Sequence, residues 1–344
     1  MAGKRQHFIP QFIQEGFASH RNGKESYTWV YHRGKPAFKS NIKNIGVEGR
    51  FYTEGEDTEA DELITSAETG LSELVTALKS GDAACLSDPR IPQLLAHLEI
   101  RTRHLRENFL RAGDYLVTRL LDFMSDEDAF AAYLERTIER DPTILRNAFE
   151  KELANQKLPK ELQEPAMEMA MPLVPFLLKR NKREFGRIAA GMRAILPDVL
   201  RKAAKLGHIG RLKKSIVPNS RVNRYQELIY RIVAITDRSL VLGDSIILLH
   251  VAGPKQYKTF LDKSDTLKAI LLPLEPGKVL IGARPGYDEI PPRLCEAIAR
   301  CSLEYFISAE TSSAVSSLAE IIGSDAGLIS QEEMEEMVTQ AISD

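Results

Sequence analysis

The spacing of hydrophobic residues changes along the chain and predicts a different structure in each part. Apolar and polar residues alternate over residues 27–31, around Trp29, which predicts a strand. Gly34 and Pro36 follow it, and this pair is typical of a tight turn. We therefore expect a hairpin whose second strand lies near residues 49–52.

Residues 59–238 have the three-to-four-residue period of amphipathic helices. The first predicted helix carries Leu63 to Leu78 on one stripe and ends near Gly81. The second runs from Ile91 to Leu121. A helix pair is expected over 126–153, broken at Asp141-Pro142. Five prolines then predict short helices: Pro159, Pro165, Pro172, Pro175 and Pro197.

Beyond Arg238 the apolar residues form short aliphatic runs bounded by glycine and proline, which predict buried strands. These strands are expected at 239–242, 245–251, 269–274 and 279–282. Helices are expected at 291–302 and 314–322, followed by an acidic amphipathic helix at 331–342.

Together these elements predict an α+β protein, in which a small mixed sheet is formed by the N-terminal and C-terminal segments and carries a large, mainly helical insertion. The expected organisation has four parts: a β-containing segment at 1–58, a helical region at 59–238, strands that complete the sheet at 239–310, and a helical acidic tail at 311–344.

Composition narrows the class of protein. Hydrophobic residues make up 43% of the 344 positions and charged residues 27%, enough apolar material for a substantial core. No uninterrupted apolar run reaches the roughly 18 residues of a membrane-spanning helix, so we expect no membrane partner and a cytoplasmic location. The three cysteines include no C-x-x-C pair. H-E-x-x-H, G-x-S-x-G and glycine-rich phosphate loops are also missing, which argues against common zinc hydrolases, serine hydrolases and nucleotide-driven enzymes.

Several short blocks of the chain resemble a known family. The opening Gln6-His7-Phe8-Ile9-Pro10 forms a Q-H-x-x-P motif, followed by Gly16-Phe17, Asn44-Ile45 and Phe51-Tyr52. These blocks resemble the start of a mostly bacterial family called domain of unknown function 4238. Its return strand, with a Ser-Asp pair, is similar to residues 240–245, where Gly243 replaces the serine before Asp244. The resemblance implies a fold and candidate positions, but no reaction.

Two candidate catalytic residues come from these blocks. His7 has the side chain best suited to proton transfer near neutral pH, although a buried histidine bonded to a backbone carbonyl explains it as well. Asp244 lies between two apolar runs, where its carboxylate could orient His7 or bind a cation. Capping a turn is the commoner role of such an aspartate.

Helical residues supply the remaining candidates. Glu68 lies beside the apolar stripe of the first helix and, with Asp244, would form a magnesium site. Arg101, three residues before His104, could stabilise developing phosphate charge. Ordinary solvated side chains are the alternative for both.

The charge distribution is uneven although the net charge is only −2. Residues 179–231 contain fifteen Lys and Arg against three acids, and nine acids but no Lys or Arg follow Arg300. The basic stretch predicts contact with phosphates. The expected nucleic-acid-binding residues are Arg201, Lys202, Lys205, Arg211, Lys213 and Lys214.

These observations support a leading hypothesis and two alternatives. The first is a nucleic-acid-acting hydrolase, toxin-like or defence-associated, whose His7 and Asp244 share a cleft. The second is a non-catalytic scaffold that binds nucleic acid or protein. In the third, the basic stretch docks the acidic tail of another copy, which would give a homo-oligomer.

Overall fold

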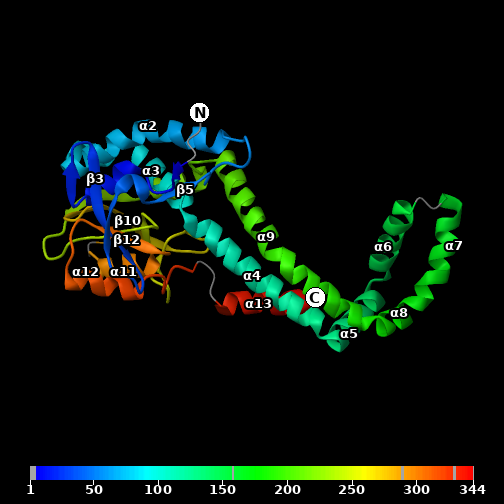
Figure 1. Cartoon of the computed structure of the whole chain (residues 1–344). Helices are drawn as coiled ribbons and strands as arrows, with labels where there is room; N and C mark the ends of the chain where they lie inside the picture. Colours follow the sequence, from blue (N-terminus) through cyan, green and yellow to red (C-terminus); the bar gives the residue numbers. More distant parts are fainter. Residues whose placement is uncertain (1–4, 157–158, 288–289, 328–330, 344) are drawn as a thin grey trace. The chain divides into compact units, whose positions relative to one another are not determined.

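The computed structural model describes residues 5–156, 159–287, 290–327 and 331–343. The chain forms two compact units: Met1–Leu110 with Ala203–Ser330, and Arg111–Lys202 with Gln331–Asp344. We call them unit 1 and unit 2. Helices α4 (Arg103–Ser125) and α9 (Lys182–Lys214) each contribute residues to both units (Figure 1). The unit boundaries therefore fall inside these two helices.

The first sheet of unit 1 joins the two ends of the chain, as the sequence predicts. Its strands are β2 (His20–Asn22), β3 (Glu25–His32), β4 (Phe38–Asn41), β7 (Leu242–Gly243) and β12 (Tyr305–Ser308). Val30 of β3 lies opposite Phe38 on one side and Ile307 on the other. The predicted hairpin turn is confirmed, with Gly34 at φ +66°. The predicted partner at 49–52 is wrong, because β4 pairs with β3 instead.

The second sheet has the strand order β6-β11-β10-β8-β9. Its strands are β6 (Ile229–Ala234), β8 (Leu248–Val251), β9 (Tyr257–Lys258), β10 (Leu267–Glu275) and β11 (Lys278–Ala283). Central strand β10 is buried on both faces, which explains its unbroken aliphatic run. Strand β6 lies within the stretch predicted to be helical, so that prediction is wrong there. A separate ladder joins β1 (Arg5–His7) to β5 (Val47–Gly49). All of these ladders are antiparallel rather than mixed.

The helices of unit 1 include α1 (Gln11–Gln14), α2 (Glu59–Ser80), α3 (Arg90–Ile100), α10 (Asn219–Gln226), α11 (Leu294–Cys301) and α12 (Ser313–Leu318). Single 3₁₀ turns lie at Glu15–Phe17, Ile42–Asn44, Ala83–Ser87 and Ala319–Ile321. Helix α2 confirms the first predicted helix and ends at Gly81, which is left-handed. The single helix predicted at 91–121 is wrong, since the chain breaks at Arg101-Thr102 between α3 and α4.

Unit 2 is helical within the described residues. Besides parts of α4 and α9 it contains α5 (Glu127–Arg140), α6 (Pro142–Asn155), α7 (Lys160–Ala170), α8 (Val174–Arg180) and α13 (Gln331–Ser343), with a 3₁₀ turn at Met171–Leu173. The predicted break at Asp141-Pro142 is confirmed. Pro197 does not end a helix as predicted, because α9 continues through it. One turn later in the same helix, Leu200 packs near Gly113 of α4.

Among the described residues, the helices are all too short or too polar to cross a membrane.

Candidate functional site

The N-terminal Q-H-x-x-P motif has a local structural explanation. Buried Gln6 accepts a hydrogen bond of 2.6 Å from the Tyr52 amide through its side-chain oxygen. Pro10 immediately precedes α1, where its missing N–H leaves no donor unsatisfied. Buried Gln14 donates to the carbonyls of Ile9 and Ile45 at 2.8 and 3.0 Å. Gln6 of the motif and Gln14 after it thus hold the N-terminal segment that carries His7 against Ile45 and Tyr52.

Arg101 joins this segment to two helices. Its side chain is 1% exposed, and its Nη1 donates to Glu68 of α2. The same Nη1 lies 2.9 Å from Nε2 of His97, one turn earlier in α3. Nη2 donates to the backbone carbonyl of His7 at 2.6 Å. We call His7, Glu68, His97 and Arg101 the His7–Arg101 cluster. The structure therefore brings together three of the four catalytic residues expected from the sequence.

His97 is neutral and helps to orient the Arg101 guanidinium in this cluster. Because the guanidinium can only donate, Nε2 of His97 accepts, and the proton must lie on Nδ1, which is 3.2 Å from the Ile216 carbonyl. Burial and the charge of Arg101 lower the pKa of His97 to about 3. His97 is not among the residues predicted from the sequence, although its four-residue spacing from Arg101 was visible.

His7 presents a neutral imidazole. Burial is the main cause that lowers the pKa of His7 below its ordinary 6.5, the Arg101 charge acts in the same direction, and Glu68 opposes both. The Gln11 side-chain nitrogen lies 3.1 Å from His7 Nε2 and, being a donor, makes Nε2 the acceptor. The ring is only half-buried. His7 therefore keeps a basic lone pair near neutral pH.

Asp61 is a second carboxylate near the cluster, and it was not among the residues predicted from the sequence. It lies seven residues before Glu68, so both are on one face of α2. Burial, together with the negative charge of Glu68, raises the pKa of Asp61, whereas the Gln6 side chain lowers it through a hydrogen bond. Glu62, by contrast, is exposed and accepts from Thr58 at 2.7 Å. The shared face with Ile64 and Glu68 was the available signal.

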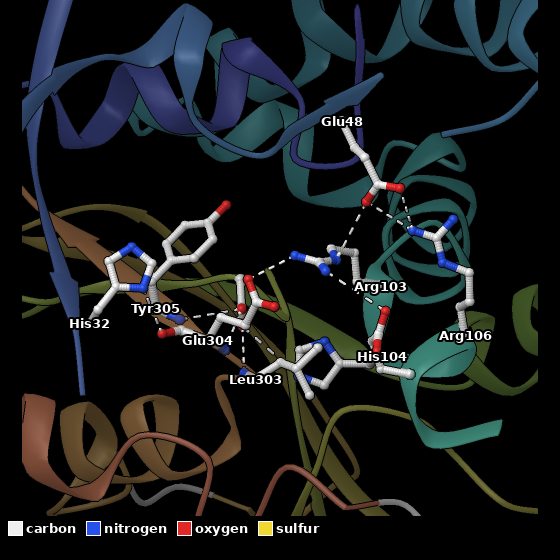
Figure 2. A network of polar contacts seen from close by, with 10 residues as sticks. His32, Glu48, Arg103, His104, Arg106, Leu303, Glu304 and Tyr305 are labelled. Carbon is white, nitrogen blue, oxygen red and sulfur yellow. Dashed lines mark hydrogen bonds and ion pairs between the residues drawn. The ribbon is translucent and has the colours of Figure 1, made fainter. Parts of the chain in front are cut away.

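Asp244 belongs to a different network, together with His104, Leu303, Glu304 and Tyr305, which are labelled in Figure 2. It is 3% exposed and accepts from the amides of Leu303, Glu304 and Tyr305 at 2.7, 2.8 and 3.4 Å. His104 Nε2 is 3.9 Å away. Burial raises the pKa of Asp244, and His104 and the three amides limit that rise. Among the described residues no hydrogen bond or ion pair joins Asp244 to His7 or Glu68.

The basic turn around Arg101 is held by internal partners rather than presented to solvent. Arg103 donates to Glu304 at 2.7 Å, and Arg106 donates to both carboxylate oxygens of Glu48 at 2.9 and 3.0 Å (Figure 2). The Arg106 guanidinium also lies over the Phe51 ring at 4.1 Å. These contacts anchor the start of α4 within unit 1.

The six basic residues selected on α9 have two different environments. Three form ion pairs: Arg201 with Asp198 at 3.2 Å, Lys205 with Glu54 at 2.8 Å, and Lys213 with Asp57 and Glu59. The others, Lys202, Arg211 and Lys214, are exposed and have no ion pair within the described part of the chain. Arg211 and Lys214, three residues apart, share one side of the helix, whereas the spacing of nine residues puts Lys202 on the side opposite Arg211, so the three do not form one continuous phosphate track.

Glu68 and Asp244, the two residues expected to bind magnesium, have different hydrogen-bonding partners. Glu68 is bonded to Arg101, and Asp244 is bonded to backbone amides. Across residues 5–156, 159–287, 290–327 and 331–343, no three His, Cys, Asp or Glu side chains are grouped to hold a metal ion.

The fold and the cluster define an α+β protein whose N-terminal strand is tied to α2 and α3 by one buried arginine. Comparison with known families then places it: the chain belongs to the family described as "Protein of unknown function (DUF4238)", which matches residues 5–180. The family resemblance of the sequence is thereby confirmed. The matched residues include all of the His7–Arg101 cluster but not Asp244. No curated protein and no solved structure matches the chain.

Proposed function

We propose that the protein is a hydrolase that cleaves phosphodiester bonds of nucleic acid, with His7 as the general base. The observation that carries the proposal is a half-buried imidazole with a lowered pKa, on a residue whose backbone carbonyl accepts from a buried guanidinium that also binds the Glu68 carboxylate. A lowered pKa keeps the His7 imidazole unprotonated at neutral pH, as a general base must be.

In this mechanism His7 Nε2 takes a proton from water as the water oxygen attacks phosphorus. The bond from phosphorus to the leaving oxygen breaks, and the imidazolium returns its proton to that oxygen. The negative charge of Glu68 favours the imidazolium, since it already opposes the lowering of the His7 pKa. The Gln11 amide now occupies the hydrogen-bonding position at Nε2, so water or substrate must displace it.

Arg101 is a positioning residue here. Its donors are used by Glu68, His97 and the His7 carbonyl, and its side chain is 1% exposed. It therefore fixes the distance between the strand of His7 and the helix of Glu68. Asp61 adds a second carboxylate on the same face of α2.

The basic C-terminal part of α9 supports nucleic acid as the substrate. Lys205 and Lys213 pair with residues 54–59, the segment that leads into α2. Exposed Arg211 and Lys214 lie on the same part of the helix. The positive charge of Arg211 and Lys214 is not used by an ion pair within the described part of the chain and is available to contact phosphates.

The test is a cleavage assay with labelled single-stranded and duplex DNA and RNA, with Mg²⁺ and with EDTA. His7→Gln should abolish cleavage while folding, checked by circular dichroism, is retained. His20→Gln, a change at an exposed histidine, is the matched control and should cleave normally. Cleavage by His7→Gln at the wild-type rate, or no cleavage by the wild type, would refute the proposal.

A non-catalytic scaffold is the second candidate. It is favoured by the internal partners of Asp244 and Arg101, whose polar groups bind other parts of the chain rather than an open site. It predicts that the protein binds nucleic acid or protein and leaves every substrate of the assay intact.

A further inference from the structure

A pocket of about 250 Å³ lies between the first turns of α4 and the last turns of α9, within unit 1. It is lined by Leu105, Arg106, Phe109, Ala204, Gly207, His208 and Arg211. Its volume is below that of pockets that bury drug-sized ligands. One planar ring system is the size of ligand that it suits.

Gly207 forms an open part of the wall. A glycine inside a helix lowers helix stability by about 1 kcal/mol relative to alanine. Its presence at position 207 therefore needs an explanation. Apart from the neighbouring residues and the backbone of the same helix, no atom lies within 4 Å of the place that a Cβ would take. The missing side chain therefore leaves free space beside the helix.

Phe109 supplies an aromatic surface. It lies on the α4 side of the pocket and is 59% exposed. What distinguishes this exposed ring from others on the surface is that it borders a pocket, so a planar ligand in the pocket could stack on it. Base–aromatic stacking is the common way in which such a ring binds single-stranded nucleic acid.

The polar groups of the pocket differ in what they can still bind. Arg106 is already engaged by Glu48 and Phe51. Arg211 is exposed, and its side chain has no ion pair or hydrogen bond within the part of the chain that the structure describes. His208 stays neutral, because burial lowers its pKa to about 4. The available charge is therefore one positive group beside an apolar, aromatic wall, which suits a flat ring that carries an anion.

We propose that this pocket accepts one unstacked base of a single-stranded nucleic acid, with the base against Phe109 and the adjoining phosphate on Arg211. The inference rests on the proposed function and specifies its substrate class. Bases in a duplex remain stacked inside the helix and cannot enter a pocket of this size. The protein should therefore prefer single strands.

The test measures the binding of a short fluorescent single strand, and of the same sequence as a duplex, by anisotropy in EDTA at several salt concentrations. Phe109→Ala should weaken single-strand binding by about 5- to 150-fold, the range for loss of one stacked base. Gly207→Leu should weaken it similarly by filling the pocket. Arg211→Gln should lower the salt slope by about one.

Two controls separate the pocket from general effects. Gly207→Ala favours the helix but adds only one methyl group, so binding should remain near wild type. Phe176→Ala removes a ring that is 61% exposed outside the pocket and should have no effect.

The outcomes distinguish this inference from the proposed function. If the wild type cleaves nucleic acid but Phe109→Ala and Gly207→Leu bind like wild type, the pocket assignment is overturned and the hydrolase stands. If binding depends on the pocket but no substrate is cleaved, the pocket stands and the hydrolase falls. Equal binding of duplex and single strand, or no binding at all, overturns the pocket assignment.

Discussion

Two buried neutral histidines should make unit 1 sensitive to mild acid. The pKa of His97 is about 3 and that of His208 about 4, both lowered mainly by burial from an ordinary 6.5. In the unfolded chain both return to about 6.5. Between pH 6.5 and the folded pKa the unfolded state therefore binds more protons, so stability falls as pH falls.

The magnitude follows from proton linkage. On going from pH 7 to pH 5, each histidine should lower the free energy of unfolding by about 2 kcal/mol, or about 4 kcal/mol for both. His7, whose pKa is also lowered, changes stability in the same direction. A loss of this size is a large part of the stability of an ordinary domain.

Urea unfolding, followed by fluorescence of the single tryptophan, Trp29 in β3, reports on unit 1. His208→Gln should be less stable at pH 7, since a buried contact with the Ile100 carbonyl changes, but should lose about 2 kcal/mol less than wild type on going to pH 5. His20→Gln, at an exposed site, should keep the wild-type slope. If the stability of His208→Gln depends on pH as steeply as that of wild type, the assignment of a neutral buried imidazole is refuted.

Three further changes test other parts of the structure by thermal and urea denaturation. Arg101→Met should lower the free energy of unfolding by about 3–5 kcal/mol, because it leaves buried partners of a charge unpaired. Arg90→Met, at an exposed ion pair, should lower it by at most about 1 kcal/mol. Equal effects of the two changes would contradict the buried role of Arg101. Asp244→Asn should cost about 1–3 kcal/mol by disturbing three amide hydrogen bonds, yet leave cleavage per folded molecule unchanged; lost cleavage in a folded variant would return Asp244 to the mechanism. Gly46→Ala should destabilise by about 1–3 kcal/mol, because φ is +61° and a Cβ would lie 2.6 Å from Cβ of Ile9; a neutral result would show that this turn relaxes.

Local patterns in the sequence predicted much of the fold. The stripe of α2 and its end at Gly81 follow from helix periodicity and from glycine at the C-terminus of a helix. The aliphatic run of β10 follows from burial on both faces. The closure of one sheet by both ends of the chain was also predicted, and the pairing of β3 with β12 confirms it.

Elements determined by distant contacts were less predictable. The break between α3 and α4 occurs at Arg101, whose side chain turns inward to residues 33 and 94 positions away. Apolar spacing continues across that break, so periodicity alone predicts one helix. Strand β6 forms because β11 pairs with it, a long-range contact that no local pattern reveals.

The candidate site was predictable in its residue types more than in its connections. His7, Glu68 and Arg101 were selected separately, and the structure joins them through one guanidinium. Asp61 and His97 were missed, although their helical spacing from Glu68 and Arg101 was visible in the sequence. Asp244 was paired with His7 on the basis of the motif, whereas its hydrogen bonds run to the chain before β12 and to the first residue of that strand.

The most direct test of the central claim is the pH dependence of phosphodiester cleavage by the wild type and by His7→Gln. The account predicts that the wild-type rate rises with pH and levels off through an apparent pKa below 6.5, and that His7→Gln is folded but lacks this activity. A folded His7→Gln variant with the same rate and the same pH profile would contradict it.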